Sequence, residues 1–351
     1  MPVSDKFWNL VTHDIGIDLG TANTMVAVKG HGIVMSEPSV VAVNKKNQQI
    51  MAVGSEARRM IGRTPANIVA VRPLKDGVIS DFDSTEAMIR YFIKKVHKLF
   101  PRMFTITKPR VVIGVPSKIT EVEGRAVIDA AVSAGARKAY IIEEPMAAAI
   151  GAHIPIDDAS GSMIIDIGGG TTDIAILSLG GIVVDNTIRI AGDEIDQEIV
   201  SYARRKYNIA IGEKMAEDIK IAIGSAIPLK KEQEAQLKGR DIVTGLPKIV
   251  KISSIEIREA ILKILDQITE AAKEALEQSP PEILSDLLES GITLVGGGAL
   301  LEGIDKYFED KLKTPVIIGE DPMEAVVRGT NTLLSEIDLL ERIQISGDDG
   351  I

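Results

Sequence analysis

Cysteine is absent from the 351 residues of the chain, which excludes disulfide bonds, thiolate nucleophiles and cysteine-ligated metals. This absence fits a reducing compartment, so we expect a cytoplasmic protein. No run approaches the roughly 20 consecutive apolar residues that a spanning helix needs. The N-terminus also lacks the basic and then apolar segments of a secretory signal. We therefore expect a chain that is not threaded through a bilayer.

Basic residues are the minority among the charged ones. The chain has 40 Lys and Arg against 50 Asp and Glu, which gives a net charge of -10. This charge repels nucleic acid and anionic lipid headgroups, so nucleic acid is not an expected ligand and a membrane contact needs an apolar anchor or a local patch. With 45% hydrophobic residues, the chain is long enough for two domain-sized cores, and no long linker separates them.

One short pattern occurs twice at a constant offset. Its acid, glycine and threonine are Asp18, Gly20 and Thr24 in the first copy and Asp166, Gly168 and Thr172 in the second. Each copy reads as a β run, an acid, a glycine-rich turn and a second β run, which predicts two β-hairpins in two related halves. We expect both turns to face one ligand in a cleft between the halves.

The remaining pattern predicts alternating strands and helices, and hence an α/β fold. Strands are expected at residues 110–115, 140–142 and 292–295, and helices at 84–99, 120–135, 145–150 and 254–278. The helix at 120–135 begins with a capping box formed by Thr120 and Glu123. A third glycine turn, at residues 296–298, follows the last strand, and the chain is expected to be helical from Leu300 onward.

The two hairpin turns suit a polyanion, because small residues let backbone N–H groups approach it closely. The first turn consists of Gly20, Thr21, Ala22 and Asn23, and the second of Gly168, Gly169, Gly170, Thr171 and Thr172. Asp18 and Asp166 beside a triphosphate need a cation, and we expect both to act on Mg²⁺ through its waters. A plain β-turn is the alternative for either turn alone. No Walker-type lysine motif is present, which excludes a P-loop NTPase.

The hairpins resemble the two phosphate loops of the actin, sugar-kinase and heat-shock-chaperone ATPase superfamily, and further motifs narrow the resemblance to its MreB branch. These motifs are residues 37–40, 72–79, 143–151, 190–194 and 292–298. The resemblance runs from about His13 to Leu334 and implies an actin-like ATPase fold with ATP and Mg²⁺ between two duplicated halves. The first loop lacks the lysine of eukaryotic actin. Asp173 stands where many MreB sequences have glutamate, which leaves the paralogue open.

The resemblance also implies four subdomains with flanking segments. Subdomain IA would comprise residues 13–32, 78–155 and 318–345, IB residues 33–77, IIA residues 156–190 and 255–317, and IIB residues 191–254. Residues 1–12 would form a membrane-binding stub and residues 346–351 a disordered tail.

Roles in catalysis are implied for two residues. Glu144 matches the acid that positions the attacking water, and Thr171 matches a threonine that assists it, which is the positioning that phosphoryl transfer requires. The alternative for Glu144 is a first-turn glutamate favoured by the helix dipole.

The adenosine contacts are likewise implied by resemblance. Glu217 and Lys220 match the purine and ribose contacts, although an i,i+3 ion pair on a surface helix is the alternative. Gly192 and Asp193 would lie near the ribose and phosphates. The loop that closes over the adenosine would be Gly296, Gly297, Gly298 and Ala299, whose alternative is a plain strand-to-helix turn.

Two apolar segments are candidates for membrane insertion. In the stub, Phe7, Leu10 and Val11 share a helical face that has Trp8 at its edge, and the other segment is the proline-broken loop that carries Phe100, Met103 and Phe104. We hypothesise that both insert. A disordered tag and a tucked loop are the respective alternatives.

The resemblance implies a slow ATPase whose membrane-associated filaments scaffold cell-wall synthesis and maintain rod shape. The implied partners are further copies of the chain in paired protofilaments, the inner face of the cytoplasmic membrane, and elongation proteins such as RodZ, MreC and MreD. A small-molecule kinase is the alternative, although no polar cluster resembles a sugar site. A peptide-binding chaperone would carry a C-terminal β-sandwich and lid, whereas this chain ends soon after Leu339.

Overall fold

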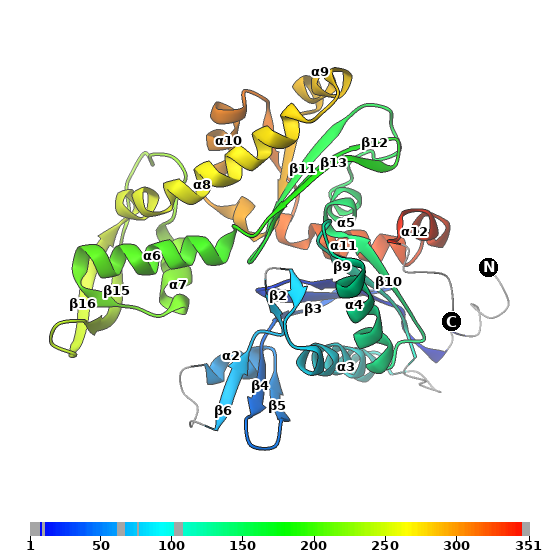
Figure 1. Ribbon diagram of the computed structural model, residues 1–351, viewed down its shortest axis with the longest axis horizontal. Coiled ribbons are helices and arrows are strands. Elements are labelled where there is room, and N and C mark those ends of the chain that lie inside the picture. Colours follow the sequence, from blue (N-terminus) through cyan, green and yellow to red (C-terminus); the bar gives the residue numbers. More distant parts are fainter. Residues whose placement is uncertain (1–7, 9–10, 62–66, 76, 102–107, 346–351) are drawn as a thin grey trace. The chain divides into compact units, whose positions relative to one another are not determined.

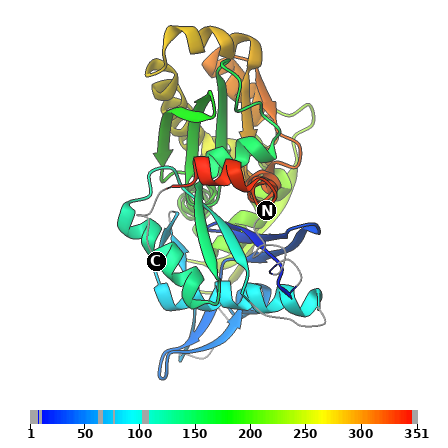
Figure 2. The same cartoon turned by 90° about the vertical axis from the view of Figure 1, so that its right-hand side faces the viewer.

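A computed structural model describes residues 8, 11–61, 67–75, 77–101 and 108–345 (Figures 1 and 2). Contacts within the chain divide it into two compact units. Unit 1 comprises Met1–Asp158, Leu179–Ile182 and Met323–Ile351, and unit 2 comprises Ala159–Ser178 and Val183–Pro322. Several predictions of membrane contact and the predicted disordered tail lie outside the described residues. They concern Phe7, Leu10, Met103, Phe104 and residues 346–351.

Unit 1 is built on a mixed five-stranded sheet in the order β10-β9-β1-β2-β3. Its strands are β1 (Ile15–Leu19), β2 (Asn23–Val28), β3 (Gly32–Pro38), β9 (Arg110–Val115) and β10 (Lys138–Glu143). β1 pairs antiparallel with β2, which confirms the first predicted hairpin, and parallel with β9. β9 also pairs parallel with β10, so the carboxyl ends of β1, β9 and β10 lie along one edge of the sheet.

Helices cover both faces of this sheet. They are α3 (Phe82–Leu99), α4 (Glu121–Ser133), α5 (Glu144–Gly151) and α11 (Ala325–Leu333). Because side chains alternate along a strand, Ile15 and Ile17 join the core formed with α3 and α4, which lie side by side (Figure 1). Between them, Gly16 faces α11, where a Cβ would stand 2.6 Å from the Thr330 Oγ1 atom. The glycine therefore allows α11 to pack directly on β1.

The rest of unit 1 consists of shorter elements. They are β4 (Val41–Asn44), β5 (Gln49–Val53), β6 (Ile68–Val71), β7 (Leu74–Lys75), β8 (Val78–Ile79), α2 (Ser55–Met60) and α12 (Ile337–Ile343). β5, β4 and β6 form a small antiparallel sheet, against which α2 packs through Ala57. This small sheet falls within residues 33–77, and the four-subdomain division itself stays a prediction.

Unit 2 repeats the sheet of unit 1 strand for strand, in the order β13-β12-β11-β17-β18. Its strands are β11 (Ser162–Ile167), β12 (Thr172–Ser178), β13 (Gly181–Ile188), β17 (Ile292–Val295) and β18 (Val316–Ile318). β11 pairs antiparallel with β12 and parallel with β17, as β1 does with β2 and β9. This common topology confirms the second hairpin and the duplication that the repeated sequence pattern predicted.

A long helix, α8, carries much of the core of unit 2. The remaining elements of the unit are α6 (Gly192–Tyr207), β14 (Ile209–Ala210), α7 (Glu213–Ile223), β15 (Glu234–Asp241), β16 (Pro247–Ser253), α8 (Ser254–Glu277), α9 (Pro281–Ser290), η1 (Gly297–Leu300), α10 (Ile304–Leu312) and η2 (Pro322–Glu324). Ile257, Ile261 and Leu265 of α8 are buried together with Ile165 and Ile176 of the sheet. The helical periodicity of this segment therefore predicted its buried face correctly.

The prediction that the chain is helical from Leu300 onward is wrong about where the helix begins. Gly297–Leu300 form a short 3₁₀ turn, and α10 begins only at Ile304. The reason is the backbone between them, because Leu301 is extended and Gly303 has a φ of 73°, a left-handed conformation.

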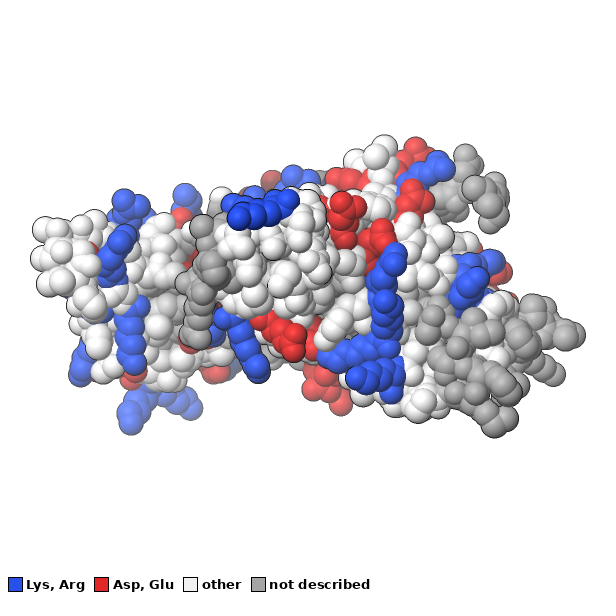
Figure 3. Space-filling model, turned by 90° about the horizontal axis from the view of Figure 1, so that it is seen from below, with Lys and Arg blue, Asp and Glu red and all other residues white. Residues whose placement is uncertain are grey.

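None of the helices in the described part of the chain combines the length and apolar character that crossing a bilayer requires. Acidic and basic side chains are both exposed on the face of the molecule shown in Figure 3.

Candidate functional site

Asp18 lies near the carboxyl end of β1, two residues before Gly20 of the first glycine turn. In the sheet it is paired with Gly114 of β9 and with Met25 of β2. Burial raises the pKa of the Asp18 carboxyl to about 7, because the ionised form has lost its water. A carboxylate in this position therefore favours a cation nearby, which fits the metal role predicted from the sequence.

Glu144 lies at the same edge of the five-stranded sheet of unit 1 as Asp18. It is the first residue of α5 and follows β10 directly. A Cβ at Gly114 would lie 3.4 Å from the Glu144 Cγ atom, and Gly114 is also the sheet partner of Asp18. The structure thus brings the two predicted acids of unit 1 to neighbouring positions, as the parallel strand ends require.

The turn from Gly20 to Asn23, called phosphate loop 1 below after its predicted role, is held by hydrogen bonds with Ser39 and Gly77. The Ser39 hydroxyl donates to the Gly20 carbonyl at 2.5 Å, and the Ser39 N–H donates to the Ala22 carbonyl at 3.0 Å. The Gly77 N–H donates to the Thr21 hydroxyl at 3.3 Å. Sequence reasoning placed Ser39 and Gly77 in family motifs but gave them no role.

The turn from Gly168 to Thr171, called phosphate loop 2 below, is held by backbone groups. Within it, the Gly168 N–H donates to the Thr171 carbonyl at 2.9 Å. The first N–H groups of α6 reach back to it, from Gly192 to the Gly168 carbonyl at 3.2 Å and from Asp193 to the Gly169 carbonyl at 2.8 Å. Gly192 and Asp193 therefore lie against phosphate loop 2, while Gly170 lies between its held ends.

Asp166 and the third glycine turn lie against each other in unit 2. Asp166 is paired with Val295, the last residue of β17, and Gly296 follows directly. Gly296 has a φ of 79°, and a Cβ there would lie 2.3 Å from the Asp166 Oδ1 atom. A Cβ at Gly298 would overlap the side chain of Ile167 in the same way, at 2.3 Å from its Cγ2 atom. Glycine at both positions is therefore required by the close approach of the two turns.

Lys220 joins α7 to the N-terminus of α6. Its ammonium group lies 2.9 Å from Asp196 Oδ1 and donates to the Gly192 carbonyl at 3.1 Å. Burial raises the pKa of Asp196 to about 6, while the nearby Lys220 charge opposes the shift. Glu217 lies one turn before Lys220 on the same helix. Asp196 is a residue of the site that sequence reasoning missed, because its partner lies on another helix.

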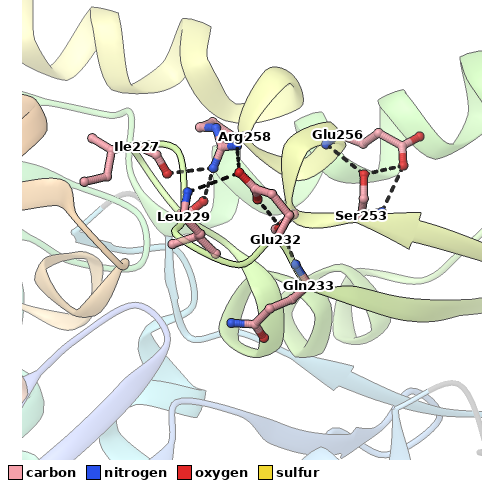
Figure 4. A network of polar contacts seen from close by, with 9 residues as sticks. Ile227, Leu229, Glu232, Gln233, Ser253, Glu256 and Arg258 are labelled. Carbon is pink, nitrogen blue, oxygen red and sulfur yellow. Dashed lines mark hydrogen bonds and ion pairs between the residues drawn. The ribbon is translucent and has the colours of Figure 1, made fainter.

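A partly buried ion pair fixes the segment that follows α7 (Figure 4). The Arg258 guanidinium lies 2.6 Å from Glu232 Oε1 and donates to the Ser225 hydroxyl at 2.6 Å. Next to Ser225, the Ala226 N–H donates to the Glu302 carbonyl at 2.8 Å, just beyond the third glycine turn. Arg258 therefore ties α8 to the segment that braces this turn, a role that no sequence motif indicated.

The predicted site residues fall into two groups by unit. Asp18, phosphate loop 1 and Glu144 belong to unit 1. The group in unit 2 is Asp166, Gly168, Gly169, Gly170, Thr171, Thr172, Gly192, Asp193, Glu217, Lys220, Gly296, Gly297, Gly298 and Ala299. That both groups hold one nucleotide and one cation stays a prediction.

The described residues of the two candidate membrane segments make contacts within unit 1. The guanidinium carbon of Arg137 lies 5.3 Å from the centre of the Trp8 ring, and the Phe100 ring stacks on His31 with centroids 4.2 Å apart. These contacts agree with the tucked-loop alternative for Phe100. Val11, expected on the outward apolar face of the stub, is only 5% exposed, so the predicted lipid-facing stripe does not include it.

Comparisons with known proteins agree with the duplicated fold. The family described as MreB/Mbl protein matches residues 12–342. The chain is 48% identical to the cell shape-determining protein Mbl of Bacillus subtilis (strain 168) over 339 residues, which are 96% of this chain and 100% of Mbl. It is also 48% identical to the cell shape-determining protein MreB of Escherichia coli (strain K12), over 95% of this chain and 96% of that protein.

A solved structure of MreB5 of Spiroplasma citri bound to ADP has a TM-score of 0.88 at 43% identity and covers 93% of this chain and 97% of that one. The same protein bound to AMPPNP gives a TM-score of 0.87. The chain therefore belongs to the MreB/Mbl family of bacterial actin homologues, the family of the cell shape-determining proteins that it matches.

Proposed function

We propose that the chain is the subunit of an ATP-dependent, actin-like filament that lies at the inner face of the cytoplasmic membrane and scaffolds cell-wall synthesis. The observation that carries this proposal is the duplicated hairpin, in which an aspartate at the end of a buried strand precedes a braced glycine turn. Further support comes from MreB5, a relative with 43% identity whose solved structures contain ADP and AMPPNP.

Phosphate binding is assigned to the two loops. Backbone N–H groups in a turn of small residues form a concavity of partial positive charge that attracts phosphate oxygens. In phosphate loop 2, two carbonyls already accept bonds from α6, so they are held away from an incoming anion. The partial positive charge at the N-terminus of α6 lies behind these carbonyls and still attracts an anion on the other side of the loop.

Magnesium is assigned to Asp18 and Asp166. The described residues contain no group of three or more His, Cys, Asp or Glu side chains that could hold a metal ion, so we assign the ion to the nucleotide rather than to a protein cage. Burial of Asp18, with its pKa raised to about 7, and the close fit of Gly296 against Asp166 agree with this assignment. When bound, Mg²⁺ neutralises charge on the phosphates.

Hydrolysis is assigned to Glu144, with help from Thr171. Glu144 is fixed by its place at the start of α5, so its carboxylate can orient a water molecule. The adenosine is assigned to Glu217, Lys220 and the turn from Gly296 to Ala299, with Gly192 beside the ribose. Lys220 is well placed for this role, because Asp196 and the Gly192 carbonyl fix its ammonium group.

Polymerisation separates this proposal from a small-molecule kinase. The purified chain is mixed with MgATP on lipid vesicles, and filaments are followed by light scattering, sedimentation and electron microscopy. We expect ATP-dependent filaments on the vesicles. Transfer of phosphate to a sugar without polymer formation would contradict the proposal.

Membrane contact needs a test of its own. Phe7, Trp8, Phe100 and Phe104 are changed to polar residues, and sedimentation with vesicles is repeated. Leu246→Ser, a change of a 64% exposed residue on the turn between β15 and β16, is the control for loss of surface apolar area. If the variant with all four substitutions sedimented with vesicles as well as the unmodified chain does, the membrane hypothesis would be wrong.

A further inference from the structure

We propose that Ser39 is a positioning residue for phosphate loop 1, which turns the N–H groups of Thr21 and Asn23 toward the nucleotide phosphates. The inference rests on the proposed nucleotide-binding function and names a residue on which one of the two phosphate contacts depends. Ser39 follows Pro38, the last residue of β3, and its side chain is fully buried.

The hydrogen bonds around Ser39 have a fixed direction. The Gly20 carbonyl can only accept, so the Ser39 hydroxyl donates its proton there, at 2.5 Å. The Thr24 hydroxyl lies 2.8 Å from the Ser39 oxygen and must therefore be the donor in that pair. Thr24 is also fully buried. The result is a directed chain from Thr24 through Ser39 to the backbone of phosphate loop 1.

The backbone of Ser39 holds the loop at a second point. Its N–H donates to the Ala22 carbonyl at 3.0 Å. One residue thus engages two carbonyl oxygens of phosphate loop 1, those of Gly20 and Ala22.

Because of the geometry of the peptide bond, these two contacts also fix the direction of the N–H groups that follow the two carbonyls. In a trans peptide the carbonyl and the following N–H point in opposite directions, and the described residues contain no cis peptide. When the Gly20 and Ala22 carbonyls point to Ser39, the N–H groups of Thr21 and Asn23 point away from it. Two donors are then presented on the face opposite Ser39, while the oxygens that would repel a phosphate are held behind.

Phosphate loop 2 provides an independent comparison. There, two carbonyls are also held from behind, but by the backbone N–H groups of Gly192 and Asp193. Thr172, the counterpart of Thr24, donates its hydroxyl to the Ile190 carbonyl at 2.8 Å. Holding the carbonyls back is therefore a feature of both copies, and in loop 1 one of these bonds comes from a side chain that mutation can remove.

A buried serine that only satisfies its own hydrogen bonds would affect stability without affecting phosphate recognition. The test therefore compares ligands with and without phosphate. Binding of MgATP, MgADP and adenosine to the full-length chain is measured by calorimetry, with adenosine followed by competition. The variants are Ser39→Ala, Ser39→Thr, which keeps the hydroxyl, and Thr24→Val, which removes only the donor to Ser39.

Ser279→Ala is the matched control. Ser279 is also buried, and its hydroxyl donates to the Ala275 carbonyl at 2.9 Å in α8, outside both phosphate loops. We expect Ser39→Ala to weaken MgATP and MgADP by about tenfold, the effect of losing one buried hydrogen bond that orients the loop, with adenosine binding unchanged. Thr24→Val should show a smaller loss of the same kind, and Ser39→Thr should recover most of the affinity. Ser279→Ala should lower the melting temperature only.

The outcomes separate the inference from the function on which it rests. If the unmodified chain does not bind MgATP, the proposed function fails and the role of Ser39 fails with it. If the unmodified chain binds MgATP but Ser39→Ala binds it equally well, only the role of Ser39 is wrong. Equal losses for MgATP and adenosine would also overturn it, since they indicate general damage. If Ser39→Ala does not fold, Thr24→Val decides between the same outcomes.

Discussion

The two phosphate loops share the acid, glycine and threonine of the repeated pattern and have matching strand pairings, yet they are held in different ways. Phosphate loop 1 depends on side chains, since the Ser39 hydroxyl and the Thr21 hydroxyl each make one of its contacts. Phosphate loop 2 depends on the backbone N–H groups of Gly192 and Asp193 and on close packing of glycine against Asp166. The duplicated fold thus preserved the position of the loop while the means of fixing it diverged.

This difference determines which kind of mutation should disrupt each loop. A loop held by hydroxyl groups fails when a hydroxyl is removed, whereas a loop held by backbone and glycine fails when a side chain is added. In the proposed function the two units also differ in their work, since hydrolysis is assigned to Glu144 of unit 1 and adenosine binding to Lys220 of unit 2.

Adding a methyl group beside phosphate loop 2 should have the largest effect. Gly296→Ala combines a left-handed backbone, with φ at 79°, with a Cβ only 2.3 Å from Asp166 Oδ1 and 2.5 Å from the Ile167 carbonyl. We expect MgATP affinity to fall by roughly 100-fold, equivalent to about 3 kcal/mol. Gly245→Ala, in the turn between β15 and β16, is the control, because this glycine also has a left-handed backbone, with φ at 75°, but a Cβ there meets nothing within 4 Å. Similar affinities for the two variants, measured by calorimetry, would contradict the assigned fit.

Removing the acid of unit 1 should separate hydrolysis from binding. Glu144→Ala should slow phosphate release by about 10-fold or more while MgATP affinity is kept, because a water-positioning group acts on turnover. Phosphate release and calorimetric affinity are measured on the same sample. Unchanged turnover would remove Glu144 from the mechanism, and a large loss of affinity would show that the two units do not divide the work in this way.

Asp196 offers a test that depends on pH. Its pKa is 3.8 when free and about 6 in the folded chain, raised by burial, by Glu217 and by Asp193 against the opposing charge of Lys220. The folded state therefore holds this proton more tightly, and the contribution of Asp196 to the free energy of unfolding falls as pH rises from about 4 to about 6. Asp196→Asn should remove that contribution and weaken ATP by about fivefold, because Lys220 loses an ionic partner.

Denaturant unfolding of both proteins across this pH range measures the difference. An identical pH profile for Asp196→Asn would show that Asp196 does not carry this proton.

The smallest effect is a direct comparison of equivalent threonines. Thr24 bonds to Ser39 and Thr172 bonds to the Ile190 carbonyl, and both side chains are fully buried. Replacing either with valine should lower the free energy of unfolding by about 1 kcal/mol, since each removes one buried hydrogen bond. Thr24→Val should reduce MgATP affinity relative to adenosine more than Thr172→Val does, because only the Thr24 hydroxyl leads through Ser39 to a carbonyl of phosphate loop 1. If the ratio of MgATP affinity to adenosine affinity changed equally in the two variants, side-chain anchoring would not be a particular feature of phosphate loop 1.

The sequence predicted those parts of the molecule that depend on local pattern. The repeated acid, glycine and threonine of the hairpins were enough to predict β1 with β2 and β11 with β12, because strand alternation and turn chemistry are local. Ser39 and Asp196 could not be given roles in this way, since their partners lie on other elements. The start of α10 at Ile304 was missed for another reason, namely the left-handed conformation of Gly303.

The proposed function requires that Asp18 and Asp166 act on one magnesium ion held by one nucleotide. A double-mutant cycle on the affinity for MgATP tests it most directly, with Asp18→Asn, Asp166→Asn and the combined variant measured with and without Mg²⁺. We expect either single change to remove most of the Mg²⁺-dependent affinity and the second change to add little. Losses that simply add, or Mg²⁺-dependent binding that survives in the combined variant, would contradict it.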